Sequence, residues 1–216
     1  MKLLIGGEKG GTGKTTIATN IIAMRRIKED KEALLVDADK QGTASYWCSL
    51  RDEDKITPRI PSIQKFGANI KNDLRELSTK YEDIVVDAGG HDSKELRSSL
   101  LVVDQVVFPV RASQFDLWTL SKLNNLVDDA RITNEQLKGF ILINAASTHP
   151  SVDEHAEVLE YMEEMDNLML LDTVIRERKV LRRCAMTGMC AIEYPQQDEK
   201  AIQEMNDLYK EIYNNE

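Results

Sequence analysis

The sequence has few cysteines, no long apolar run and no excess of basic residues. Its three cysteines, Cys48, Cys184 and Cys190, are too few for a disulfide framework, and their spacing matches neither a zinc nor an iron–sulfur motif. Free thiols, and the lack of a signal-peptide core after MKLLI, favour a cytoplasmic protein. No apolar run approaches the roughly eighteen residues of a membrane-spanning helix, so we expect no membrane partner.

The charge balance is acidic. The 216 residues include 37 Asp and Glu but only 28 Lys and Arg, a formal net charge of −9. This balance argues against a protein that wraps nucleic acid over its whole surface, but a local basic patch remains compatible with it. Hydrophobic residues make up 42% of the chain and charged residues 30%, as in folded proteins, and the length favours one domain over residues 1–216.

Short apolar runs alternate with stretches of helical spacing. The runs are rich in Val, Ile and Leu without polar alternation, as expected for strands buried on both faces. They cover residues 3–5, 33–39, 83–88, 105–110, 139–144 and 168–172. Residues 116–131 have a helical pattern, whereas residues 52–67, with two prolines, predict an irregular connection. We therefore predict an α/β fold with a mostly parallel sheet and helices on both faces.

The stretch GGEKGGTGKTT, from Gly6 to Thr16, predicts a phosphate-binding loop. It misses the general P-loop pattern by one position, because Glu8 stands where the first glycine belongs. Backbone N–H groups and the start of a helix near Lys14 would surround a phosphate, and Thr15 would offer its hydroxyl to Mg²⁺. A glycine-rich turn is the alternative. The expected nucleotide-binding residues are Lys9, Gly10, Gly11, Thr12, Gly13, Lys14, Thr15 and Thr16.

Lys9 gives the loop a second lysine. The string KGGTGKTT resembles the deviant Walker A box of the ParA/MinD ATPases, and this resemblance implies ATP and Mg²⁺ as cofactors in a P-loop NTPase fold. It also implies an ATP-bound homodimer, in which Lys9 crosses to the phosphates of the partner subunit and joins Lys14 in catalysis. A polyanion between the two lysines would remove their repulsion. The alternative for Lys9 is an ordinary solvated lysine.

Two further segments carry candidate carboxylates. LLVDADKQG resembles the family's V-D-x-D-x-Q box, which implies that Asp39 positions the attacking water and Asp37 supports the Mg²⁺ shell. Asp39 could instead cap a helix over residues 43–50. DIVVDAGG resembles a Walker B strand, in which Asp87 would hold Mg²⁺ through a water. The alternative for this second segment is a buried strand that ends in a turn.

The resemblance continues along the chain. QVVFPVRASQFDLWTL resembles the family's strand–loop–helix unit, with Ala112 in place of a proline and a helix start at residues 116–117. GFILINAAS resembles the strand that ends near the base, where Asn144 could read adenine, although an asparagine there is also a common turn residue. The C-terminal helix is apolar on one face and acidic on the other. We expect it to pack on the sheet rather than on anionic lipid.

A basic cluster stands out in this acidic chain. Its members are Arg176, Arg178, Lys179, Arg182 and Arg183. Placed on one helix face, they could bind DNA phosphates without reading bases, and the family resemblance implies such nonspecific DNA binding. The alternative is a solvated helix whose arginines pair with Glu177 and other carboxylates.

The resemblance as a whole implies a small ParA-type plasmid-partition ATPase without an N-terminal DNA-reading extension. It would associate with the nucleoid and hydrolyse ATP slowly, and a centromere-binding adaptor protein would stimulate this hydrolysis. Two alternatives remain open: a related ATPase that positions another cellular cargo, and a nucleotide-gated regulator with little turnover.

Overall fold

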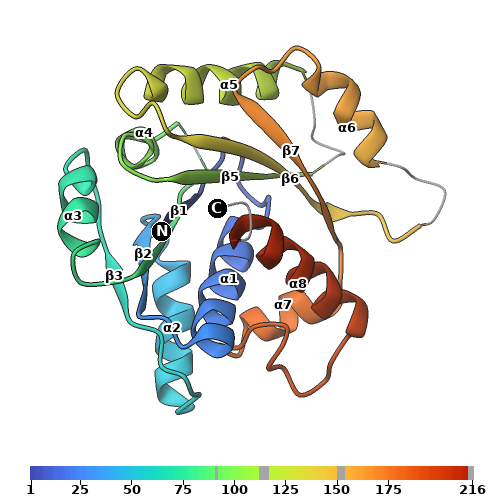
Figure 1. The fold of residues 1–216 in the computed structure, drawn as a ribbon. Helices are drawn as coiled ribbons and strands as arrows, with labels where there is room; N and C mark the ends of the chain where they lie inside the picture. The colour runs from blue at the N-terminus through green and yellow to red at the C-terminus, as the bar shows by residue number, and fades with distance from the viewer. Residues whose placement is uncertain (91, 112–116, 150–153, 214–216) are drawn as a thin grey trace.

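The computed structural model describes residues 1–90, 92–111, 117–149 and 154–213. Ala112 and Asp116, which the sequence assigned to a strand–loop–helix unit, lie outside these ranges. Within them, seven parallel strands form one sheet in the order β3-β2-β4-β1-β5-β6-β7 (Figure 1). The strands are β1 (Lys2–Ile5), β2 (Ala33–Ala38), β3 (Ser62–Gln64), β4 (Asp83–Ala88), β5 (Gln105–Val110), β6 (Lys138–Ala146) and β7 (Leu168–Arg176).

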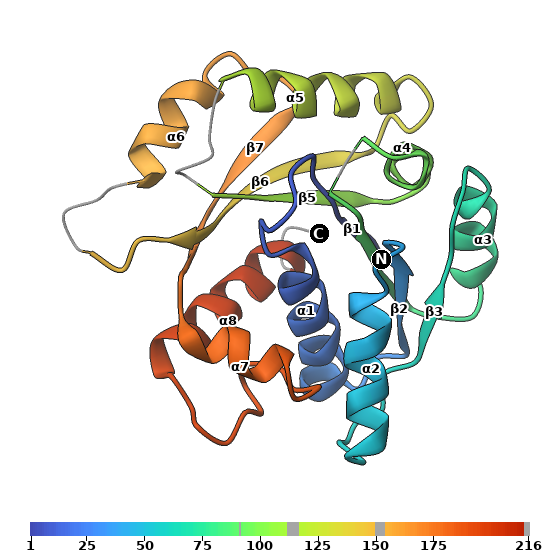
Figure 2. The same cartoon turned by 180° about the vertical axis from the view of Figure 1, so that it is seen from behind.

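Helices cover both faces of the sheet (Figures 1 and 2). One face carries α1 (Lys14–Glu29), α2 (Thr43–Glu53), α7 (Lys179–Ala185) and α8 (Glu199–Tyr213). The other carries α3 (Ile70–Leu77), α4 (Lys94–Leu100), α5 (Leu117–Arg131) and α6 (Glu154–Met162). Each layer has its own apolar core, and β2, β4 and β5 are buried along their whole length. The predicted α/β fold is confirmed.

The connection expected over residues 52–67 contains a strand that the sequence reading missed. β3 has three residues, of which only Ile63 is partly buried, and it pairs with β2 at the edge of the sheet. The backbone N–H of Leu35 also donates to the carbonyl of Pro61 at 3.0 Å. Such a short edge strand forms through backbone pairing with its neighbour, so it leaves little apolar pattern in the sequence.

The C-terminal helix packs as the sequence predicted. Its buried residues are Ala201, Met205, Leu208, Tyr209, Ile212 and Tyr213. Its acidic face also covers the open edge of β7: Glu211 accepts hydrogen bonds from the backbone N–H groups of Asp172 and Thr173, and Glu204 accepts one from Arg176. These carboxylates therefore satisfy donors that an edge strand would otherwise expose.

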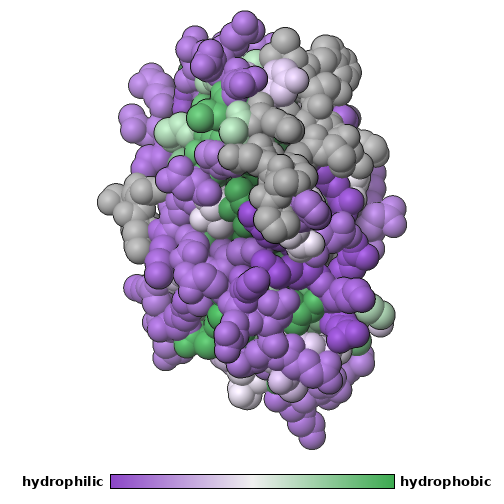
Figure 3. All heavy atoms as spheres, turned by 90° about the vertical axis from the view of Figure 1, so that its right-hand side faces the viewer, coloured by the Kyte–Doolittle hydropathy of each residue, from purple (hydrophilic) through white to green (hydrophobic). Residues whose placement is uncertain are grey.

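The side of the molecule that lies at the right of Figure 1 is mainly hydrophilic in its described residues. The apolar residues visible there form small, separate patches (Figure 3). In the described ranges, we found no helix with the length and apolar character needed to cross a bilayer.

Candidate functional site

The glycine-rich loop connects β1 to α1 at the carboxyl edge of the sheet. Gly13 caps α1 with φ 89°, a left-handed conformation that favours glycine. A methyl group on Gly13 would lie 2.2 Å from Nδ2 of Asn144, at the end of β6. The same Nδ2 donates a 2.7 Å hydrogen bond to the carbonyl of Thr12. The side chain of Asn144 therefore supports the loop, although it lies more than one hundred residues away in the sequence.

Lys14 points back into its own loop. Its side-chain nitrogen donates to the carbonyl of Lys9 at 2.8 Å, and the residue is 7% exposed. Burial lowers the pKa of Lys14, while the charges of Asp87 and Asp39 act in the opposite direction. The backbone of Lys9 thus holds the ammonium group of Lys14 close to two of the candidate carboxylates.

Thr15 and Asp87 meet beneath the loop. The Thr15 hydroxyl donates to Oδ2 of Asp87 at 2.7 Å. Burial raises the pKa of Asp87 to about 7, with a further contribution from Asp37, and the bond from Thr15 opposes the shift. A hydroxyl beside a buried carboxylate is an oxygen donor pair of the kind Mg²⁺ prefers, and a cation would stabilise the ionised form of Asp87. This donor chemistry fits Mg²⁺.

A site closed by protein ligands alone is not present among the described residues. Within those ranges, no cluster of three or more His, Cys, Asp or Glu could hold a metal ion. Protein sites for Mg²⁺ commonly use one or two protein oxygens and leave the remaining positions to phosphates and water. The Thr15–Asp87 pair matches that arrangement.

Asp37 lies beside Asp87 in the sheet and is fully buried. Its Oδ1 accepts from the backbone N–H of Asp39 at 3.1 Å, and its Oδ2 accepts from that of Ser45 at 2.8 Å. Ser45 is the third residue of α2, so Asp37 satisfies a free N–H at the start of that helix. Asp37 therefore holds the strand end and α2 in place.

The helix-capping alternative for Asp39 is wrong. Its Oδ1 accepts from the backbone N–H of Gln41 at 3.0 Å, which lies ahead of α2, and Gly42 is the N-cap residue. The carboxylate instead lies beside Gly89, where an added methyl group would come within 3.3 Å of Asp39 Cγ. Asp39 is thus part of the pocket that the segment after β4 helps to form.

The segment after β4 contacts the phosphate loop closely. A methyl group on Gly90 would lie 2.8 Å from the carbonyl oxygen of Lys9 and 2.9 Å from the nitrogen of Gly10. A pocket on this side is lined by Gly10, Ala38, Asp39, Lys40, Gln41, Gly89, Gly90, Ser93 and Glu95. Gly10 of the phosphate loop, Asp39 and the two glycines after β4 therefore line one pocket, and Lys40 is exposed at its edge.

A second pocket opens on the other side of the loop. It is lined by Gly13, Thr16, Arg111, Asn144, Ala145, Arg176, Glu177, Arg178, Leu181 and Arg182. Asn144 lines this pocket while its Nδ2 supports the carbonyl of Thr12, and its contact with adenine stays a prediction. Thr16 and the ends of β6 and β7 form the remaining wall.

The predicted DNA-binding cluster does not form one helix face. Arg176 ends β7 and Arg178 is the N-cap of α7, and only the remaining three members are inside that helix. Arg178 is 12% exposed and donates to both oxygens of Glu204, which raises the pKa of Arg178. Arg182 forms an ion pair with Glu177, as the solvated-helix alternative predicted.

The cluster therefore separates into three groups. Arg178 lines the second pocket but is paired with Glu204, Arg176 and Arg182 line the same pocket without contacting Glu204 through their side chains, and Lys179 and Arg183 are exposed outside it. The sequence reading grouped these residues by charge and proximity along the chain. The charge pattern alone does not show that β7 ends and α7 begins between these residues.

One contact of the loop and one pocket residue were also missed. Glu8 forms an ion pair with Lys122 of α5, so the residue that breaks the P-loop pattern attaches the loop to the neighbouring helix. Arg111, directly after β5, lines the second pocket. The departure of Glu8 from the P-loop pattern was the only signal in the sequence for its ion pair with Lys122.

Known proteins are similar to this chain. Residues 3–192 match the family model of the CobQ/CobB/MinD/ParA nucleotide binding domain. The Halothiobacillus neapolitanus protein named "Maintenance of carboxysome distribution protein A" is 25% identical over 211 residues, which cover 97% of this chain and 95% of that protein.

Solved structures agree on the fold. Apo McdA from Cyanothece superposes with a TM-score of 0.75 at 15% identity, over 98% of each chain. A putative plasmid partition protein from Borrelia burgdorferi, bound to AMPPNP, superposes with a TM-score of 0.70 at 20% identity, over 100% of this chain and 99% of the other.

Proposed function

Because the chain belongs to the CobQ/CobB/MinD/ParA family of nucleotide-binding domains, we propose that it is an ATPase that distributes a large protein assembly within the cell. The observation that supports this cargo class is the match to a carboxysome-distribution protein over nearly the whole length of both chains. At 25% identity, that match supports a shared type of switch, and the cargo itself need not be a carboxysome.

Plasmid partition, the first expectation from the sequence, is the second candidate. The fold shared with the Borrelia protein favours it. Its whole-length sequence support is weaker, because that similarity is one of fold at 20% identity. The two candidates differ in the adaptor that recruits the cargo: one binds a centromere-like DNA site and the other binds a protein assembly.

The nucleotide chemistry is assigned to the residues around the loop. Lys14 and the N–H groups at the start of α1 would bind the phosphates, and Thr15 with Asp87 would hold Mg²⁺, which neutralises phosphate charge. Asp39 would orient the attacking water, and Asp37 would fix the backbone that carries Asp39. Phosphoryl transfer to water depends on such positioning more than on covalent help from the protein.

Lys9 is assigned to dimerisation. Its carbonyl oxygen holds Lys14, so its backbone is fixed at the mouth of the loop. From there, its side chain would reach the phosphates of a second subunit. ATP between two subunits would then stabilise the dimer, and hydrolysis would weaken it. We also propose that the dimer binds DNA nonspecifically through Lys179 and Arg183, which are exposed on α7.

Sizing the protein by light scattering with ADP and with a non-hydrolysable ATP analogue tests this proposal. We expect a monomer with ADP, a dimer with the analogue, and slow ATP hydrolysis under turnover conditions. A monomer under both conditions would contradict the proposal. To separate the two cargoes, the ATP-bound protein is offered an adaptor with and without its centromere DNA. A requirement for that DNA would favour plasmid partition.

A further inference from the structure

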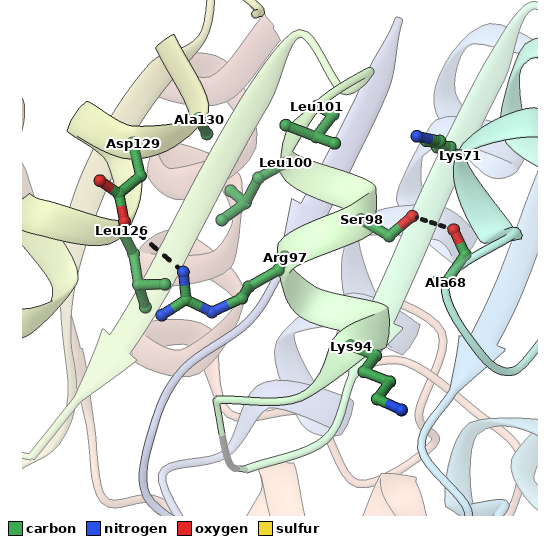
Figure 4. Close-up of a pocket in the computed structure, with 10 residues that line it drawn as sticks. All are labelled: Ala68, Lys71, Lys94, Arg97, Ser98, Leu100, Leu101, Leu126, Asp129 and Ala130. Atoms are coloured by element: carbon green, nitrogen blue, oxygen red, sulfur yellow. Dashed lines mark hydrogen bonds and ion pairs between the residues drawn. The ribbon is translucent and has the colours of Figure 1, made fainter. Parts of the chain in front are cut away.

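A hollow on the helical layer opposite α1 has no role in the nucleotide chemistry. Its volume is about 390 Å³, within the usual range for binding pockets. It lies over α4, between α3 and α5 (Figure 4). It is lined by Ala68, Lys71, Lys94, Arg97, Ser98, Leu100, Leu101, Leu126, Asp129 and Ala130. We call it the α4 groove.

The α4 groove combines an apolar floor with a basic rim. Leu100, Leu126 and Ala130 are buried beneath it, and Leu101 is partly exposed. Lys71 on α3 and Lys94 on α4 stand at the rim, and neither makes an ion pair within the part of the chain that the structure describes. The groove thus combines local positive charge with apolar surface in a chain whose net charge is −9.

We propose that the α4 groove docks an acidic peptide segment of a partner protein, one that carries leucine-like side chains between its carboxylates. The carboxylates would pair with Lys71 and Lys94, and the apolar side chains would cover Leu101 and the floor. Charge complementarity argues for this occupant over a second copy of the acidic chain, which would bring further negative charge without a matching apolar segment.

Arg97 connects the α4 groove to the nucleotide site. Its guanidinium pairs with both oxygens of Asp92, at 2.6 and 2.7 Å, and lies 3.5 Å from Asp129 of α5. Asp92 follows Gly90 by two residues, and Gly90 lies against the backbone of Lys9 and Gly10. A peptide carboxylate that binds Arg97 would compete with Asp92. Docking would therefore shift the conformational equilibrium of the segment after β4. Because Gly90 contacts the phosphate loop, the conformation of that loop would change as well.

This inference deepens the proposed function, because a partner docked here would act on the nucleotide pocket. Its first test needs no ATP. A fluorescein-labelled synthetic peptide with leucines between glutamates is titrated with nucleotide-free protein and followed by anisotropy. We expect saturable binding that weakens at least about tenfold in the variant Lys71→Glu with Lys94→Glu. The same variant should prefer a matched peptide in which lysines replace the glutamates.

The matched control is Lys55→Glu with Lys200→Glu, which changes the net charge equally at two exposed lysines on other parts of the surface. We expect the control to bind like the unmodified chain, and circular dichroism checks that both variants are folded. Absence of saturable binding, or an equal loss in the control, would overturn the docking proposal. The protein could fail to dimerise with ATP and still bind the peptide more weakly in the Lys71→Glu, Lys94→Glu variant than in the control. That result would contradict the proposed function and support the docking proposal.

The connection to the nucleotide site has its own readout. Saturating peptide should change the dissociation constant of a fluorescent ATP analogue, and the analogue should change peptide affinity by the same factor. We expect a change of about threefold or more in the unmodified chain and none in the Lys71→Glu, Lys94→Glu variant. An unchanged constant in the unmodified chain, with the peptide bound, would overturn the role given to Arg97.

Discussion

The Thr15 hydroxyl donates a 2.7 Å hydrogen bond to Asp87, joining the first turn of α1 to the end of β4. Asp87 is 1% exposed, and the nearest cation, Lys14, is bonded to the carbonyl of Lys9. A carboxylate in such a place is costly to ionise until a cation arrives. The site is therefore arranged for a bound cation at a cost to the stability of the nucleotide-free protein.

The substitution Asp87→Asn should stabilise the nucleotide-free protein at pH 8 but not at pH 4. In the folded chain the pKa of Asp87 is raised to about 7 from its ordinary 3.8, so the folded state holds a proton that the unfolded state has lost. The contribution of this proton to the free energy of unfolding is complete below the pKa of the unfolded state and is lost as pH rises through the folded pKa of about 7. Thermal melts from pH 4 to 8, in EDTA, measure the effect.

The expected gain for Asp87→Asn at pH 8 is of the order of a few kcal/mol, because the pKa of Asp87 is raised from 3.8 to about 7 in the folded chain. Asp54→Asn, at an exposed position after α2, is the control and should leave the pH dependence unchanged. If the melting temperatures of the unmodified chain and Asp87→Asn change with pH in the same way, the account of this carboxylate is contradicted.

Gly90→Ala should destabilise the nucleotide-free protein by about 1–3 kcal/mol, since overpacking of this kind forces backbone to move. The added methyl group would meet the Lys9 carbonyl at 2.8 Å. Gly10→Ala is the matched control in the neighbouring segment, because no atom lies within 4 Å of the added group. Urea unfolding curves give both values. Equal stability of the two variants would show that the segment after β4 does not contact the loop.

Arg178 and its basic neighbours should behave differently. Arg178→Ala leaves Glu204 without its bidentate partner and should cost about 1–3 kcal/mol of folding stability. Lys179→Ala with Arg183→Ala should leave stability unchanged, weaken DNA retention by the ATP-bound protein, and reduce its salt dependence by about two counterions per subunit. Lys55→Ala with Lys200→Ala is the control. Equal loss of DNA retention in that control would remove α7 as the DNA surface.

Asp39→Ala should slow ATP turnover by about a hundredfold or more and leave the ATP-dependent dimer intact, because the carboxylate is assigned to the attacking water and not to nucleotide binding. A phosphate-release assay measures the rate, and light scattering measures the dimer. Asp128→Ala, an exposed aspartate on α5, is the control. Turnover that matches the control would transfer the water-positioning role to another group.

The fold was predictable from the sequence because its strands are buried on both faces. The expected bounds of β4 and β5 match those observed, and the start of α1 at Lys14 follows from the loop pattern. β3 was missed because a short edge strand with one apolar residue depends on pairing with its neighbour.

The positions of the candidate site residues could also be predicted from the sequence, but contacts between distant segments could not. The positions of Thr15, Asp37, Asp39 and Asp87 follow from strand ends that share one edge of the sheet. The support of the loop by Asn144 and the pairing of Arg178 with Glu204 depend on segments that meet only in the folded chain. Sequence charge alone therefore grouped Arg178 with residues that face a different environment.

The most direct test concerns Lys9. Light scattering with a non-hydrolysable ATP analogue compares the unmodified chain with Lys9→Ala, and with Lys40→Ala as a control lysine at the edge of the pocket that Gly10 and Asp39 line. Equilibrium binding of the analogue is measured alongside. We predict that Lys9→Ala binds the analogue but remains a monomer, whereas the unmodified chain and Lys40→Ala dimerise. A Lys9→Ala protein that dimerises as well as the unmodified chain would contradict the account.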